Sequence, residues 1–164
     1  MAYDAREAII QLIMSSLQGI PGLVNVWRDR GLGEPYDVET ELPVVPAAIF
    51  LDGKERSTQP STVGHGLRPG PLPPVPMIFE PQIYIILLPR TTIANEGVAA
   101  ELANWRMLVL KAMLRNPDLM NLLGTEGDIH WTGLATDMQS GSLCRGEIRF
   151  DFAIKYVFNP DDLD

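Results

Sequence analysis

CRGEIRFDFAIKYVF, residues 144–158, is the stretch that decides the fold. From residue 147 onward its apolar side chains occupy every second position. Successive side chains of a β-strand point to opposite faces of a sheet, so this alternation predicts a long strand with one buried face. We expect the apolar face to pack on helices and the other face to meet water or another subunit. The apolar face consists of Ile148, Phe150, Phe152, Ile154, Tyr156 and Phe158, and the other consists of Glu147, Arg149, Asp151, Ala153, Lys155 and Val157.

Three more strands are predicted upstream of residue 90. β-Branched and aromatic residues dominate residues 23–28, and an apolar run covers residues 47–52. Residues 77–88 alternate at first and then become apolar on both faces, which indicates a strand buried on two sides in its second half. Pro81 has no backbone N–H to donate, so we expect a sheet edge or a bulge at that position.

Helical spacing of apolar residues predicts two long helices. The first covers residues 4–18, where Asp4 and Glu7 have the spacing of a capping box. The second covers residues 96–115 and places its basic residues late, as the helix dipole favours. A short third helix follows between Asn116, a good N-cap residue, and Gly124.

A final hairpin completes the predicted sheet. Residues 128–136 form its first strand, and the short polar segment 137–143 joins it to the strand quoted above. Strands and helices therefore do not alternate along the chain, which favours a mainly antiparallel or mixed sheet over a parallel one. We predict a single α+β domain over residues 1–164, a two-layer α/β sandwich with two long helices on one face of the sheet.

Glycine and proline are concentrated in one segment. Residues 53–76 contain ten of the chain's 14 glycines and 14 prolines. Proline removes backbone donors and glycine adds backbone freedom, so we expect this segment to be a loop rather than a continuation of the sheet. Connections of this length are uncommon in compact domains and are either functional or simple surface insertions.

The charge and hydropathy of the chain exclude several classes of protein. Its 13 Lys and Arg face 21 Asp and Glu, for a formal charge of -8, which argues against a protein that grips nucleic-acid phosphates. The longest uncharged apolar stretch, residues 81–89, is about half of the ~20 residues that a membrane-spanning helix needs. The first residues lack the pattern of a signal peptide, so we expect a soluble protein made and kept inside the cell.

Residues suited to catalysis or metal binding are few. Cys144 is the single cysteine, so the chain forms no internal disulfide. We expect His65 to be a solvated loop residue and His130 to lie on a sheet surface; neither has a second ligand at metal-binding spacing. We therefore predict no catalytic, cofactor or metal site, with a small hydrolase using His130 or Cys144 as the remote alternative.

Assembly is the more plausible basis of function. A chain that is 46% hydrophobic and yet this acidic can hide apolar surface by associating with further subunits. The charges of alternating sign on the last strand suit both exposure to solvent and a lateral contact between subunits. The residues concerned are Glu147, Arg149, Asp151 and Lys155.

With its elements in this order, the chain resembles the tail-terminator (tail-completion) proteins of long-tailed phages, the family that includes the phage lambda tail terminator. The similarity runs through nearly the whole chain and consists of core and turn residues. It comprises residues 6–17, Val26-Trp27-Arg28, Leu42-Pro43, residues 49–53, residues 77–85 with Pro81, residues 116–119, residues 122–124, residues 127–129, Gly133, Asp137, Gly146-Glu147, Phe150, Phe152 and Tyr156.

The resemblance implies a subunit of a hexameric ring that sits on the finished tail tube. Such a ring stops polymerisation of the tail-tube protein and offers a docking surface to the neck or head-completion protein, without a cofactor or catalytic residue. It would be assembled in the host cytoplasm and remain in the tail or neck of the virion. An acidic lumen would let DNA pass without holding it, because like charges repel the phosphate backbone.

Two further expectations follow from this resemblance. We expect the Gly/Pro-rich loop to contact a tail or neck partner through Arg56, His65 and Arg68. The alternative within structural proteins is another head-tail joining part, such as a neck (stopper) protein, or a minor tail protein.

Overall fold

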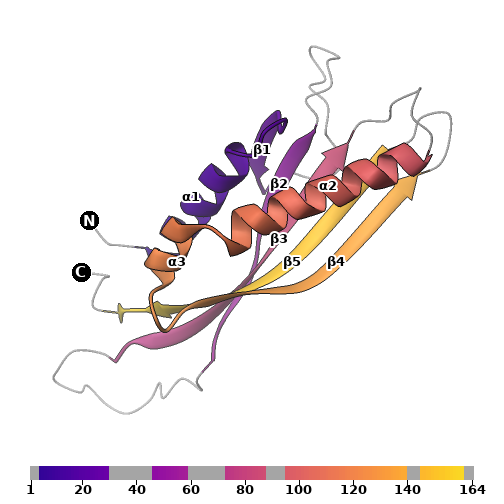
Figure 1. Cartoon of the computed structure of the whole chain (residues 1–164). Coiled ribbons are helices and arrows are strands. Elements are labelled where there is room, and N and C mark those ends of the chain that lie inside the picture. The colour runs from indigo at the N-terminus through magenta and orange to yellow at the C-terminus, as the bar shows by residue number, and fades with distance from the viewer. Residues whose placement is uncertain (1–3, 30–45, 59–72, 88–94, 140–144, 161–164) are drawn as a thin grey trace.

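The structure, a computed structural model, describes residues 4–29, 46–58, 73–87, 95–139 and 145–160. One five-stranded sheet forms one layer, and three helices lie together on one of its faces (Figure 1). The predicted α+β architecture of two layers is confirmed, and so is the order of its elements along the chain.

The sheet is mainly antiparallel, as expected. Its strand order is β1-β2-β3-β5-β4. Only the β1–β2 pair is parallel, whereas the β2–β3, β3–β5 and β4–β5 pairs are antiparallel. The strands are β1 (Asn25–Arg28), β2 (Ala47–Ser57), β3 (Val75–Leu87), β4 (Asp128–Gln139) and β5 (Arg145–Phe158).

Helices α1 and α3 have the boundaries that their capping residues predict. The carboxylate of Asp4 accepts a hydrogen bond from the backbone N–H of Glu7 at 3.1 Å and begins α1. The side-chain oxygen of Asn116 accepts two backbone hydrogen bonds and begins α3, which ends at Gly124. The helices are α1 (Ala5–Gln18), α2 (Asn95–Leu114) and α3 (Pro117–Leu123).

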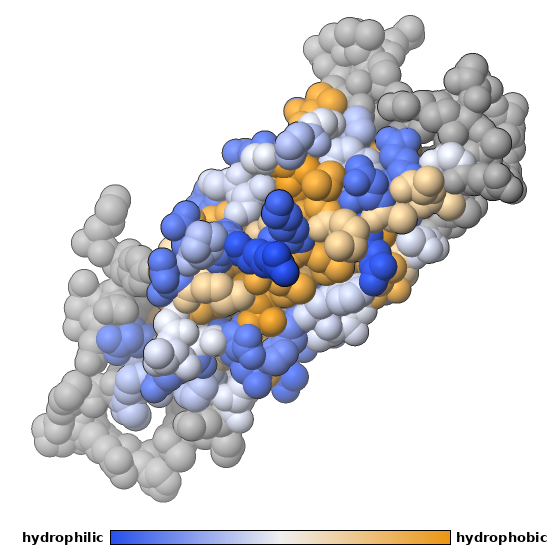
Figure 2. Space-filling view, viewed as in Figure 1, coloured by the Kyte–Doolittle hydropathy of each residue, from blue (hydrophilic) through white to orange (hydrophobic). Residues whose placement is uncertain are grey.

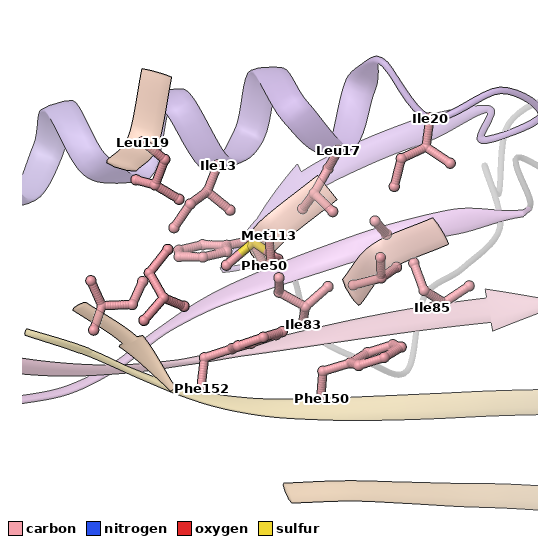
Figure 3. Packing of buried hydrophobic residues seen from close by; sticks show 14 of the residues in the cluster. Ile13, Leu17, Ile20, Phe50, Ile83, Ile85, Met113, Leu119, Phe150 and Phe152 are labelled. Carbon is pink, nitrogen blue, oxygen red and sulfur yellow. The ribbon is translucent and has the colours of Figure 1, made fainter. Parts of the chain in front are cut away.

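The core lies between the helices and the sheet. Phe150 and Phe152 of β5 are buried there, as the alternation of that strand predicts. Side chains of α1 and of the end of α2 pack against the same face of the sheet, so apolar residues far apart in sequence contact one another there (Figure 3). The labelled members are Ile13, Leu17, Ile20, Phe50, Ile83, Ile85, Met113, Leu119, Phe150 and Phe152.

The extent of the long loop was predicted wrongly. β2 continues to Ser57 and β3 already begins at Val75, so both ends of the segment 53–76 belong to a hairpin. Gly53 has φ +67° and lies where the β2–β3 register shifts between Leu51 and Lys54. Gly53 therefore lies in a β-bulge, and the hydrogen-bonded pairing of β2 with β3 resumes after it. Residues 59–72 lie outside the described part of the chain.

Pro81 marks a bulge but not an edge. β3 lies between β2 and β5, so the alternative of an edge strand is wrong. The extra residue of β2 faces Pro81, where the missing N–H removes one ladder hydrogen bond. β4 has a second register shift, between Trp131 and Gly133, at the same level of the sheet. The two bulges flank the central β3–β5 pair.

Candidate functional site

The candidate site is the face of the sheet turned away from the helices, which we call the helix-free face. Strand register decides which residues share it, because directly paired residues point to the same side. Arg56 pairs with Ile78, which in turn pairs with Lys155. The fold thereby brings five of the predicted interface residues onto one face: Arg56, Glu147, Arg149, Asp151 and Lys155.

A polar network occupies the centre of this face. The guanidinium of Arg149 lies 3.3 Å from the carboxylate of Asp151. The side-chain amide of Gln82 donates a hydrogen bond of 2.8 Å to the same carboxylate. The charge of Asp151 and a hydrogen bond with Tyr84 raise the pKa of Arg149. Nε of Arg149 is buried and makes no hydrogen bond within the described ranges, so the group has donor capacity left.

An apolar cluster lies beside the network. Ile49, Tyr84 and Arg149 lie in one row across β2, β3 and β5, and Trp27 of β1 extends the row. The helix-free face therefore has an apolar half, formed by β1, the first part of β2 and the last part of β3, and a charged half, formed by β5 and by the parts of β2 and β3 beyond the bulge. The buried members of the apolar half are Ala47, Ile49, Tyr84 and Ile86, with Trp27 and Leu51 packed against them.

The charges of the helix-free face balance, although the whole chain carries a formal charge of -8. A balanced face can approach another surface of an acidic neighbour without the net repulsion that an evenly acidic surface would cause. Among the side chains that the structure describes, the cations here are Lys54, Arg56, Arg149 and Lys155, and the carboxylates are Glu80, Asp128, Glu147 and Asp151.

The two bulges open a cavity on the same face. It measures about 370 Å³ and lies over Pro81, between Lys54 and Glu80 on one side and Thr132 on the other. Gln82 and Asp151 from the central strands also line it. The cavity has polar groups of both charges, so it suits a polar side chain of a partner.

A second charged cluster ties α1 to the sheet, and the sequence analysis missed it. Arg28 of β1 donates to both oxygens of Asp52, at 2.8 and 2.7 Å, and to Glu7 of α1 at 2.9 Å. These bonds hold the pKa of Asp52 below its ordinary value and raise that of Arg28. The three residues come from distant segments, so neither spacing nor a motif signals their meeting.

The cluster continues beneath α1. Arg6 lies 3.3 Å from Asp52, and its guanidinium stands 4.9 Å from the ring centroid of Phe79. The hydroxyl of Tyr156 donates a hydrogen bond to Glu55. Burial, and then this bond, raises the pKa of Tyr156, so the hydroxyl stays protonated. Every charged member has a partner of opposite sign, which indicates a structural connection between α1 and the sheet.

The remaining predicted residues divide into two groups. His130 lies on the sheet surface as predicted, half exposed, with Nε2 3.0 Å from Asp128. His65, Arg68 and Cys144 lie outside the described residues.

Within the described ranges, no three His, Cys, Asp or Glu side chains gather as a metal site would require. None of the helices described is both long and apolar enough to cross a membrane.

No protein-family model matches the chain, and no curated protein matches it.

Proposed function

We propose that this protein is a structural subunit of a long-tailed phage that caps the tail tube. In this proposal it ends polymerisation of the tube and provides the surface on which the head docks. The observation that carries the proposal is the charged half of the helix-free face, where the described cations and carboxylates are equal in number although the chain is acidic. A face of this kind fits contact between copies of one subunit.

The arrangement of the two layers supports a ring. The helices occupy one face of the sheet, so each copy has two chemically different surfaces to offer (Figure 1). Contacts between unlike surfaces generate rings when the rotation closes. Six copies, the number implied by the resemblance to tail terminators, would enclose a lumen through which DNA passes without sequence-specific binding.

The proposed partners follow from that position. One side of the ring would bind the end of the tail tube, and the other would bind the neck or head-completion protein. The protein would then be assembled in the host cytoplasm and remain in the tail or neck of the virion. A neck or stopper protein is the nearest alternative, and it would bind the adaptor on the portal side instead of the tube.

A tube-elongation assay tests the proposal. Tail-tube protein is polymerised with and without the purified chain, and tube lengths are measured by electron microscopy. We expect tubes to stop growing once the chain is added, and we expect the mean tube length to fall as the amount of chain increases. Tubes that grow equally long in both cases, together with binding to the portal-side adaptor, would favour the stopper alternative.

A further inference from the structure

The helix layer has a groove on the surface remote from the helix-free face. It measures about 350 Å³ and lies between the end of α1 and the end of α2. Ile20, Pro21 and Leu108 give it an apolar floor, and Lys111 and Arg115 stand at its rim. In Figure 2 the helix side is a mixture of apolar surface and strongly hydrophilic patches over α1 and α2.

The two cations of the groove have no ion-pair partner among the described residues. Arg6, Arg28, Arg56 and Arg149 all pair with carboxylates. Lys111 and Arg115 are exposed and form no ion pair with any described residue, as is also true of Lys54, Arg106 and Lys155, but only these two cations line the groove. Two unpaired cations above an apolar floor, in a chain of net charge -8, fit an acidic segment that also carries an apolar side chain.

We propose that the groove binds residues 161–164 of a neighbouring copy. This segment reads Asp-Asp-Leu-Asp and follows the last described residue, Pro160. Its leucine fits the apolar floor, and its carboxylates fit Lys111 and Arg115. The inference deepens the proposed function and rests on it, because it names a contact that links one copy of the ring to the next.

The position of the end of β5 favours a neighbouring copy over the same chain. Phe158 pairs with Val75 at the end of the sheet that reaches beyond α3 (Figure 1). The groove opens beside Ser16, Gly19 and Ile20, where α1 ends, and α1 runs away from that end of the sheet.

Charge reversal in the full chain tests the contact. One variant carries K111E and R115E, and the other carries D161K and D162K. Each variant alone should associate about three- to tenfold more weakly by midpoint concentration in sedimentation velocity, because two exposed ion pairs become repulsive. An equimolar mixture of the two should regain the wild-type midpoint, since each groove then meets a tail of opposite charge. R106E reverses a single charge on α2 outside the groove and should leave the midpoint unchanged.

Two results would overturn the inference. The first is a wild-type midpoint in both reversed variants. The second is weakened association that mixing does not restore, because a contact within one chain is broken in each variant and stays broken.

Peptide binding separates this inference from the proposed function. A labelled peptide of residues 159–164 should bind the wild-type chain in fluorescence anisotropy, more weakly at high salt, and at least about tenfold more weakly to K111E/R115E. A peptide with asparagine in place of each aspartate is the matched control. Equal binding of both peptides contradicts the groove assignment, whereas failure of the wild-type chain to cap tubes contradicts the proposed function alone.

Discussion

Gly53 is the residue on which the hairpin of β2 and β3 depends. Its φ is +67°, and a Cβ added there would lie 1.9 Å from the backbone oxygen of Glu80. Gly124 has the same φ but no atom within 4 Å of an added Cβ. Comparing alanine substitutions at the two glycines therefore separates the cost of backbone strain from the cost of a steric clash.

Gly53→Ala should lower the free energy of unfolding by roughly 3 kcal/mol or more, since the β2–β3 backbones must move apart. Gly124→Ala should cost less, about 1–3 kcal/mol, because only the conformational part applies: φ +67° with ψ -159° is a region that essentially only glycine adopts. Urea unfolding followed by circular dichroism measures both. Equal costs for the two substitutions would mean that the bulge does not require the close approach of the strands.

Asp52 predicts a pH dependence of stability. Arg28 keeps the pKa of this carboxylate below its ordinary value of 3.8 in the folded state. The ion pair therefore contributes fully above the unfolded-state pKa, and its contribution is lost as the pH falls through the lower folded-state pKa.

Asp52→Asn should cost about 1–3 kcal/mol at neutral pH, because Arg28 loses its charged acceptor. The difference from wild type should shrink between about pH 5 and pH 2. Urea unfolding across this range provides the measurement. Glu126→Gln removes an exposed carboxylate without an ion pair among the described residues and is the control. A pH-independent cost of Asp52→Asn would show that the charge is not what matters.

At the scale of elements, local sequence patterns were sufficient to predict those helices and strands whose boundaries depend on neighbouring residues. The alternation of β5 and the caps Asp4 and Asn116 were sufficient to place β5, α1 and α3. The extension of β2 past Gly53 was missed because it depends on cross-strand register, which local composition does not show. The cluster of Arg28, Asp52 and Glu7 was missed for the same reason. Part of the helix-free face could be predicted from the sequence, because its β5 residues occupy alternate positions of one strand.

Asn116 links α3 to α1 as well as beginning its helix. Its side-chain oxygen accepts from the backbone N–H groups of Asp118 and Leu119, and its amide donates to the hydroxyl of Ser16. Asn116→Ala should therefore lower the free energy of unfolding by about 1–2 kcal/mol. Asn121→Ala, on the exposed side of α3, should change it by less than about 0.5 kcal/mol. Thermal unfolding of both variants would reveal whether the cap is needed.

At the scale of the whole molecule, the distribution of charge is the informative property. The acidic excess of the chain does not extend to the helix-free face, where cations and carboxylates are equal in number among the described side chains. Replacing cations of this face by carboxylates should make the face acidic and so restore electrostatic repulsion between copies of the chain.

R149E/K155E should therefore weaken self-association by at least about tenfold, while R106E on the helix side should not. Sedimentation velocity at several concentrations compares the three proteins, and circular dichroism checks that each is folded. Association of the double variant at the wild-type concentration would remove the helix-free face from the interface between copies.

Electron microscopy of the chain mixed with the tail-tube protein that we propose as its partner tests directly whether the chain caps tubes. Class averages of tube ends show whether a ring is present and what symmetry it has. If the chain caps tail tubes as proposed, we expect six-fold caps on the ends of tubes that have stopped growing. Tubes of unregulated length without caps would contradict it.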